Sequence, residues 1–182
     1  MTSLQRVKIW DPVLRLSHWC LAGAFSATYW LGSEWRGLHA HLGYVVALLV
    51  LFRIIWGFAG PAHALFKDFL PRFKMLKAYL VNRAPTQPGH DPLGALMIVA
   101  LLASLTVTAM TGMTLYAMEG RGPLAATFVV SWSGSLVEQI HHLASETTLW
   151  LVIVHVLGVL IMGRYHRQRL IRAMFDGMKW RR

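Results

Sequence analysis

The sequence is poor in charged residues and in cysteine, and both shortages narrow the class of protein. Only 14% of its 182 residues are charged, whereas 55% are hydrophobic and the mean hydropathy is positive. Such a composition is typical of a chain that is surrounded mostly by lipid. Cys20 is the only cysteine, so no disulfide can form within the chain. We therefore expect an integral membrane protein, with residues 1–182 forming one domain.

Acidic residues are also scarce, with eight Asp and Glu against 18 Lys and Arg, a formal net charge of +10. In a membrane protein, basic residues record topology and contact with anionic lipid, so we expect membrane lipid and not nucleic acid as the partner. Nearly all Lys and Arg lie in the N-terminal segment, in residues 62–90 and in the C-terminal tail, whereas the two other loops hold only Arg36 and Arg121. By the positive-inside rule, both termini face the cytoplasm.

Four apolar runs predict membrane helices at about 13–31, 38–58, 93–118 and 140–162. The chain starts with polar residues, so we expect no cleavable signal peptide and a first run that stays as an anchor. Residues 119–139 are too short and broken to span, and are interpreted as a re-entrant or interfacial cap. Basic amphipathic stretches at 70–80 and after Arg164 predict cytoplasmic surface helices. The expected fold is an all-α, up-down bundle of four transmembrane helices.

Histidines recur at matched depths in three of these helices. His18 and His155 lie toward the cytoplasmic side, and His39 and His141 open their helices on the opposite side. His141 and His155 are fourteen residues apart, so they share one helix face and lie about 21 Å apart along the axis. The depths therefore pair His18 with His155 and His39 with His141.

Each histidine pair could hold one planar haem between two helices, which makes the bundle a carrier of two b-type haems about 20 Å apart. Without a Cys-x-x-Cys-His motif, the haems would be bound non-covalently. Two imidazole ligands leave iron no open position, which suits electron transfer. Zinc fits less well, because no carboxylate or thiol accompanies the pairs. Gly43 follows His39 by one turn, as Ala22 and Gly158 follow His18 and His155, and such gaps suit a flat macrocycle or simple close packing of helices.

The same regions carry a family resemblance. It rests on Val7-Lys8-Ile9-Trp10-Asp11-Pro12, Arg15-Leu16-Ser17-His18-Trp19, Leu38-His39-Ala40-His41-Leu42-Gly43-Tyr44, Phe52-Arg53-Ile54-Ile55-Trp56-Gly57-Phe58-Ala59-Gly60-Pro61, Gly89-His90-Asp91-Pro92-Leu93-Gly94 and His155-Val156-Leu157-Gly158. These stretches closely resemble the bacterial cytochrome b561 and nickel–iron hydrogenase b-type cytochrome family. The resemblance implies a four-helix cytochrome of the bacterial inner membrane that passes electrons between periplasmic redox partners and quinone. Its ligand pattern falls on His18, His39, His141 and His155.

Other polar residues near these positions have open roles. Arg53 could reach the membrane interface or a cofactor carboxylate. His41 and His142 each stand beside an expected ligand, where they could contact haem propionates, take up protons or supply interfacial polarity. His63 and His90 could serve a quinone or propionates, or could be capping or surface residues.

Three functions follow as alternatives. The first, which we favour, is an electron-transfer subunit between the quinone pool and a periplasmic c-type cytochrome or other redox protein. The second is a stand-alone superoxide:quinone oxidoreductase, which would want a cationic funnel on the far side. The third is a haem-free membrane scaffold. A homo-oligomer is compatible with each of them.

Overall fold

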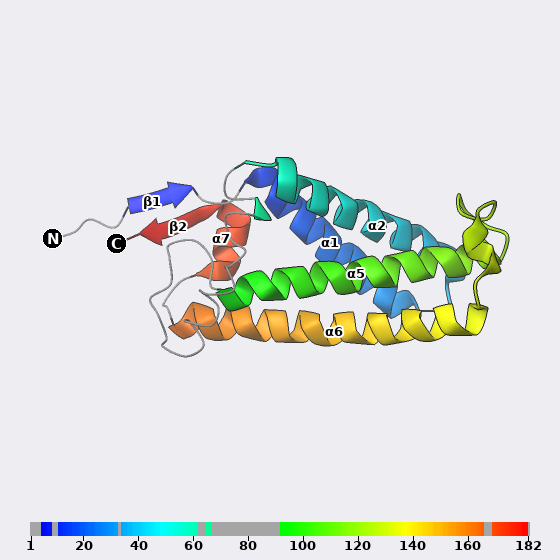
Figure 1. Ribbon diagram of the computed structural model, residues 1–182. Helices are drawn as coiled ribbons and strands as arrows, with labels where there is room; N and C mark the ends of the chain where they lie inside the picture. Colours follow the sequence, from blue (N-terminus) through cyan, green and yellow to red (C-terminus); the bar gives the residue numbers. More distant parts are fainter. Residues whose placement is uncertain are drawn as a thin grey trace. The chain divides into compact units, whose positions relative to one another are not determined.

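The computed structural model describes residues 5–8, 11–32, 34–61, 65–66, 92–165 and 169–181. Their order is β1 (Gln5–Lys8), α1 (Pro12–Leu31), α2 (Arg36–Ala59), α5 (Pro92–Met118), η2 (Phe128–Ser131), α6 (Gly134–Tyr165), α7 (Leu170–Asp176) and β2 (Met178–Arg181) (Figure 1). Four of the helices are long, with 20 to 32 residues each. The expected surface helix at 70–80, together with His63 and His90, lies outside the described residues.

The chain divides into two compact units, and each long helix contributes residues to both. We call the first the cavity unit, which contains His18–Phe52 and Ala100–Leu151. The second is the terminal unit, which contains Met1–Ser17, Arg53–Val99 and Val152–Arg182.

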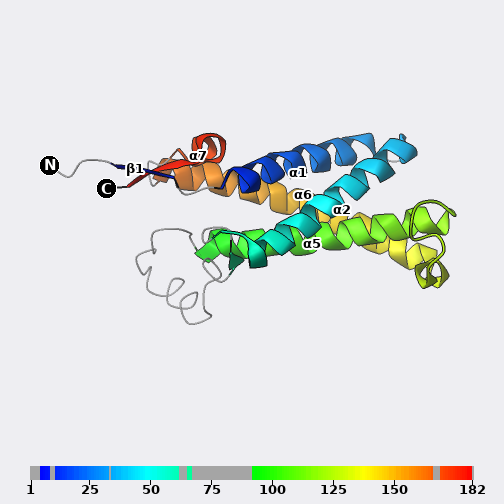
Figure 2. The ribbon, with the colours of Figure 1, turned by 90° about the horizontal axis from the view of Figure 1, so that it is seen from above.

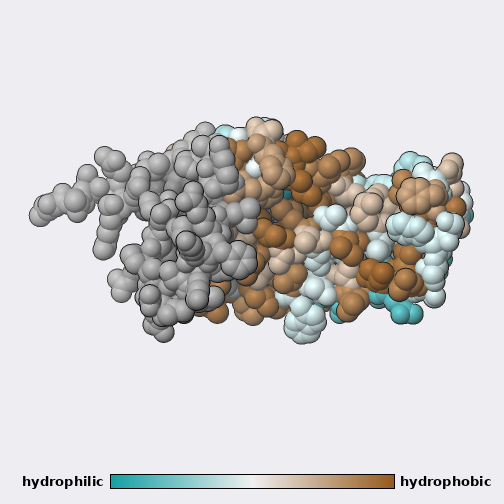
Figure 3. Space-filling model, viewed as in Figure 1, coloured by the Kyte–Doolittle hydropathy of each residue, from teal (hydrophilic) through white to brown (hydrophobic). Residues whose placement is uncertain are grey.

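Three of the described helices, α2, α5 and α6, are long and apolar enough to cross a membrane. Large apolar side chains on them are exposed, for example Leu48, Leu143 and Ile161. Figure 3 shows hydrophobic residues gathered over the middle of the face drawn there. A helix that presents so much apolar surface needs lipid around it. The 20-residue α1 is not in this set, because Arg15 and His18 interrupt its first turns.

Two features of the fold correct the expectations from sequence. The helix α6 begins at Gly134 rather than near residue 140, because Val137 is buried and its backbone N–H donates to the Ser133 carbonyl at 3.0 Å. The preceding connection therefore covers only residues 119–133 and includes the short η2. In addition, the chain is not purely helical, because β1 and β2 pair antiparallel, with Lys8 opposite Met178. A pairing across so large a sequence separation leaves no local signal.

Within the cavity unit, α5 and α6 run side by side in both ribbon views (Figures 1 and 2). The hydroxyl groups of Ser104 on α5 and Thr148 on α6 lie 2.7 Å apart, and Ser104 also donates to the Ala144 carbonyl at 3.2 Å. Thr148 is fully buried. Small and hydroxyl-bearing residues of this kind let membrane helices approach closely and bond to each other.

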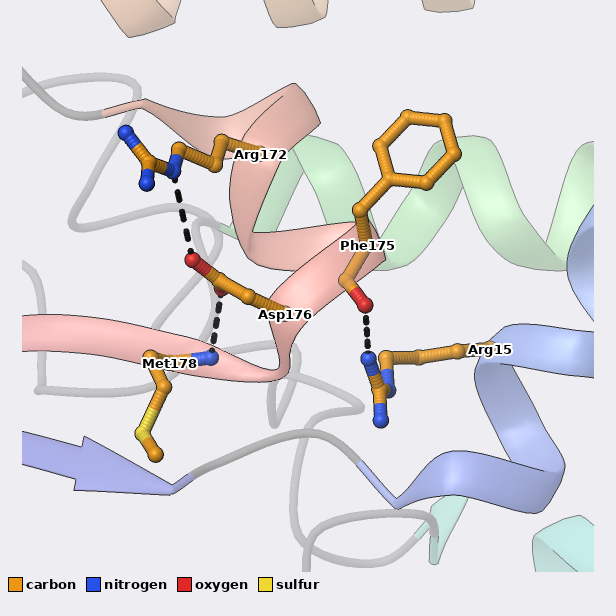
Figure 4. Close-up of polar contacts among 5 residues, drawn as sticks. All are labelled: Arg15, Arg172, Phe175, Asp176 and Met178. Atoms are coloured by element: carbon orange, nitrogen blue, oxygen red, sulfur yellow. Dashed lines mark hydrogen bonds and ion pairs between the residues drawn. The ribbon is translucent and has the colours of Figure 1, made fainter.

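In the terminal unit, side chains at the start of α1 make hydrogen bonds to other helices. Asp11 Oδ2 accepts the N–H of Leu14 at 3.1 Å, which caps α1, and the indole N–H of Trp56 at 3.2 Å. The guanidinium of Arg15 donates to the carbonyl of Phe175 in α7 (Figure 4). Helix α7 ends at Asp176, and the next residue, Gly177, has a φ of 74° before β2 begins.

Candidate functional site

His39 on α2 has one ring nitrogen fixed by a backbone carbonyl. Its Nδ1 lies 3.0 Å from the carbonyl oxygen of Thr28 on α1. A carbonyl can only accept a hydrogen bond, so Nδ1 carries the proton and Nε2 keeps a free lone pair. This is the tautomer that a metal-binding histidine needs, and the hydrogen bond also fixes the direction of the ring.

His141 on α6 is held in the same way, but by two acceptors on α5. Its Nδ1 lies 3.0 Å from the carbonyl oxygen of Thr108 and 3.1 Å from the hydroxyl oxygen of Thr111. Because Thr111 donates its own proton to the Val107 carbonyl at 2.7 Å, its oxygen is available to accept from His141. Nε2 of His141 is then the unprotonated nitrogen.

A glycine on α5 makes room for the His141 ring. A Cβ atom built on Gly112 would lie 2.9 Å from Cε1 of His141 and 3.4 Å from Nδ1. Real Cβ atoms avoid contacts this short, so any larger residue at 112 would displace the ring. Although α5 has no histidine of its own, it therefore provides the space and the hydrogen-bond acceptors for the His141 ring.

The rings of His39 and His141 lie edge-on to each other at a distance suited to one metal. Their centroids are 6.3 Å apart with an interplanar angle of 77°. Two imidazoles on opposite sides of one metal, with metal–nitrogen bonds of about 2 Å, have ring centres about 6 Å apart. The pair therefore has the separation of two axial ligands.

A cavity of about 730 Å³ surrounds this histidine pair, within the cavity unit. This volume lies in the range of cofactor pockets. Gly43 lines the cavity, and nothing lies within 4 Å of the place where its Cβ would be. The hydroxyl of Tyr44, another lining residue, is buried and has no hydrogen-bond partner among the described residues. A wide cavity with two facing imidazoles, a glycine gap and an unpaired donor fits a haem with its carboxylates.

The expected ligands His39 and His141 differ in exposure from the neighbouring histidines His41 and His142. His41 is exposed, and its Nδ1 lies 2.6 Å from the carbonyl of Gly37 on its own helix. His142 is exposed as well, although it lines the cavity and packs edge-on against His141, with ring centroids 6.3 Å apart. By contrast, His39 and His141 are both partly buried.

His18 and His155, the other expected pair, belong to different units. His18 lies in the cavity unit, with its ring centroid 5.4 Å from that of Trp19, whereas the partly buried His155 lies in the terminal unit. Their pairing stays a prediction. Among the described residues, no three His, Cys, Asp or Glu side chains lie together as a group that could hold a metal ion.

Arg53 lies in the terminal unit, on α2. Its guanidinium carbon is 5.3 Å from the ring centroid of Phe66, and its Nη1 is buried without a hydrogen-bond partner among the described residues. A buried guanidinium nitrogen of this kind can serve a carboxylate, but the role of Arg53 stays a prediction.

Sequence reasoning missed the residues that orient the two histidines and the unpaired hydroxyl. They are Thr28, Thr108, Thr111, Gly112 and Tyr44. The hydroxyl-rich run on α5 is visible in the sequence, but threonines in membrane helices commonly bond to their own helix. Only the packing of α5 against α6 shows which of them reaches a histidine.

Comparisons with known proteins place the chain among b-type cytochromes. The family model described as prokaryotic cytochrome b561 matches residues 9–177. Three relatives carry the name probable Ni/Fe-hydrogenase B-type cytochrome subunit. The one from Rhizobium leguminosarum bv. viciae is 25% identical, over 95% of this chain and 88% of the relative. Those from Azotobacter vinelandii and Cupriavidus necator are 28% and 26% identical, over 96% and 97% of this chain and 88% of each relative. No solved structure matches this chain significantly.

Proposed function

The chain belongs to the prokaryotic cytochrome b561 family, and from this premise we propose that it carries electrons across the bacterial inner membrane through two b-type haems. As a member of this family it is a membrane-bound b-type cytochrome of electron transport. The proposal adds the number of haems, their four histidine ligands, a four-helix transmembrane bundle and the two redox partners.

The observation that carries the proposal is the facing pair His39 and His141, 6.3 Å apart across a cavity, each with its Nδ1 bonded to a neighbouring helix. These two residues would hold one haem. When bound, the haem supplies a one-electron change at an iron with no open coordination position. Thr28, Thr108 and Thr111 hold Nδ1 of the two rings, which leaves each Nε2 for the iron. Tyr44 would offer a hydrogen bond to a haem carboxylate.

His18 and His155 would hold the second haem. His155 is fourteen residues after His141 on the continuous helix α6, so the two ligands lie about 21 Å apart along its axis. Such a spacing suits one site near each side of a bilayer with a hydrocarbon core of about 30 Å. Arg53 is our candidate for a carboxylate contact near this second site.

The fourth membrane span would be α1, whose 20 residues reach about 30 Å. Arg15 can extend to the interface from the first turn. The positive-inside rule then places both termini in the cytoplasm, and the His39–His141 cavity on the periplasmic side.

The partners we propose are quinone and a periplasmic redox protein. The relatives are named as hydrogenase cytochrome subunits, which supports a metal-containing oxidoreductase as the electron donor or acceptor. A soluble c-type cytochrome is the alternative that copurification from native membranes would distinguish.

A superoxide:quinone oxidoreductase is less well supported, because the described residues that line the cavity do not form a cationic funnel. Among the described residues, its lining includes the acidic residues Glu119, Glu138 and Glu146 and one basic residue, Arg36, which itself pairs with Glu119 at 3.0 Å. Like charges would repel superoxide. Rapid mixing of the reduced and oxidised protein with superoxide and with quinone would separate the two functions.

A reduced-minus-oxidised visible spectrum with a haem:protein ratio tests the proposal. We expect b-type bands and two haems per chain, and substitution of His39 or His155 by alanine should each remove one. Absence of a b-type α-band would refute a cytochrome and leave a haem-free scaffold, whereas a ratio of one would refute the second site alone.

A further inference from the structure

A second groove, of about 500 Å³, lies in the terminal unit where the end of α6 meets α7. Six of the nine residues that line it are uncharged, and five of these are large and apolar. The uncharged residues are Val159, Leu160 and Gly163 from α6 and Leu170, Ile171 and Phe175 from α7. An apolar lining of this kind accepts a hydrocarbon chain rather than a polar solute.

Three arginines complete the lining of this groove, Arg164, Arg169 and Arg172. Arg172 pairs with Asp176 at 3.5 Å, and Asp176 also accepts the backbone N–H of Met178 at 2.9 Å (Figure 4). Arg164 and Arg169 are exposed and make no ion pair with any described residue. Two uncompensated positive charges therefore stand beside the apolar lining.

The wall of the groove formed by α7 is held in place by other parts of the terminal unit. Arg15 on α1 donates to the carbonyl of Phe175, as Figure 4 shows. Gly177 then ends the helix in the left-handed conformation. Tertiary contacts therefore fix the position of α7 at the groove.

We propose that this groove binds one anionic phospholipid, with an acyl chain on the apolar lining and the phosphate between Arg164 and Arg169. Basic pockets at the cytoplasmic ends of membrane helices bind anionic head groups in this way. A zwitterionic lipid would bring its own positive charge toward the two arginines and gain less. This site is separate from the histidine cavity, since every residue that lines it belongs to the terminal unit.

The test is lipid binding to the purified full-length chain, measured by native mass spectrometry after delipidation in detergent. Dioleoyl phosphatidylglycerol should bind at least tenfold more tightly than dioleoyl phosphatidylcholine, because each arginine near an anionic lipid adds roughly a factor of five. The double variant Arg164→Gln/Arg169→Gln should lose about 30-fold in affinity for phosphatidylglycerol and little for phosphatidylcholine. The charge-preserving variant Arg164→Lys/Arg169→Lys should retain most of the preference.

Two further variants keep the test decisive. Gly163→Leu fills the groove and should weaken the binding of both lipids, and it provides the answer if the double glutamine variant does not fold. Arg121→Gln, which removes an exposed arginine in the cavity unit, should change neither affinity. Equal affinity for the two lipids, or full retention by the double glutamine variant, would overturn the proposal. So would displacement of the lipid by millimolar inorganic phosphate alone, which would assign the arginines to a soluble anion.

Discussion

The imidazole rings of His39 and His141 lie with their centroids 6.3 Å apart. Nδ1 of His39 on α2 is bonded to an oxygen of α1, and Nδ1 of His141 on α6 is bonded to an oxygen of α5. The first prediction concerns this pair. His39→Ala and His141→Ala should each lower the haem:protein ratio by one, because each would remove one of the two side chains that we propose hold the haem. The measurement is a pyridine haemochrome assay against protein concentration.

The matched controls are the neighbouring histidines. His41→Ala and His142→Ala should keep the full haem content, because both side chains are exposed. If His142→Ala lost a haem and His141→Ala kept it, His142 and not His141 would be the haem ligand.

The second prediction concerns Gly112 on α5, which makes room for the ring of His141. Gly112→Ala places a Cβ 2.9 Å from Cε1 of His141, so the ring must shift, at a cost of about 1–3 kcal/mol. We expect a lower thermal midpoint and a lowered occupancy of one haem. Gly94→Ala is the control on the same helix, because nothing lies within 4 Å of its Cβ position. If both variants behave alike, the contact with His141 is not the cause.

The third prediction concerns Thr111. Thr111→Val removes one of the two acceptors for the Nδ1–H of His141 while the Thr108 carbonyl remains. The ligand then donates less electron density, so the midpoint potential of one haem should rise by about 40 mV, the equivalent of one ordinary hydrogen bond. Potentiometric titration gives the value. Thr106→Val, whose hydroxyl donates to the Leu102 carbonyl of its own helix, should leave both potentials unchanged.

The fourth prediction concerns the unpaired hydroxyl of Tyr44. In haem-depleted protein, Tyr44→Phe should raise stability by about 1 kcal/mol, because it removes a buried donor without a partner among the described residues. In haem-loaded protein the same change should lower stability, because it removes a hydrogen bond to the bound group. Thermal midpoints of both forms check this reversal of sign. A change of the same sign in both forms would contradict a role toward the ligand.

The fifth prediction concerns the start of α1. Asp11→Ala removes both the cap of the helix and the acceptor of the Trp56 indole, which should cost about 1–2 kcal/mol. Asp11→Asn keeps an acceptor oxygen and should lose much less. Chemical denaturation monitored by tryptophan fluorescence compares the two, and equal losses would show that charge and not hydrogen bonding matters there.

Hydropathy and composition were sufficient to predict a helical membrane protein, since an apolar run of 20 residues has few other stable forms in lipid. The family, too, was recognisable from local motifs, and the match over residues 9–177 confirms it. The start of α6 was misplaced because Gly134 and Ser135 are typical of a loop. In the structure Val137 is buried and its N–H donates to the Ser133 carbonyl, so that turn is helical.

The sequence by itself predicted that His141 and His155 share one face of a helix, because helix periodicity depends only on residue number. It could not determine what orients the histidine rings. The choice of nitrogen on His39 and His141 depends on Thr28, Thr108 and Thr111, which are 11 to 33 residues away along the chain and on other helices. The tertiary structure alone decided these contacts, because a hydrogen bond is made across space and needs an angle and a distance of about 3 Å that no local pattern encodes.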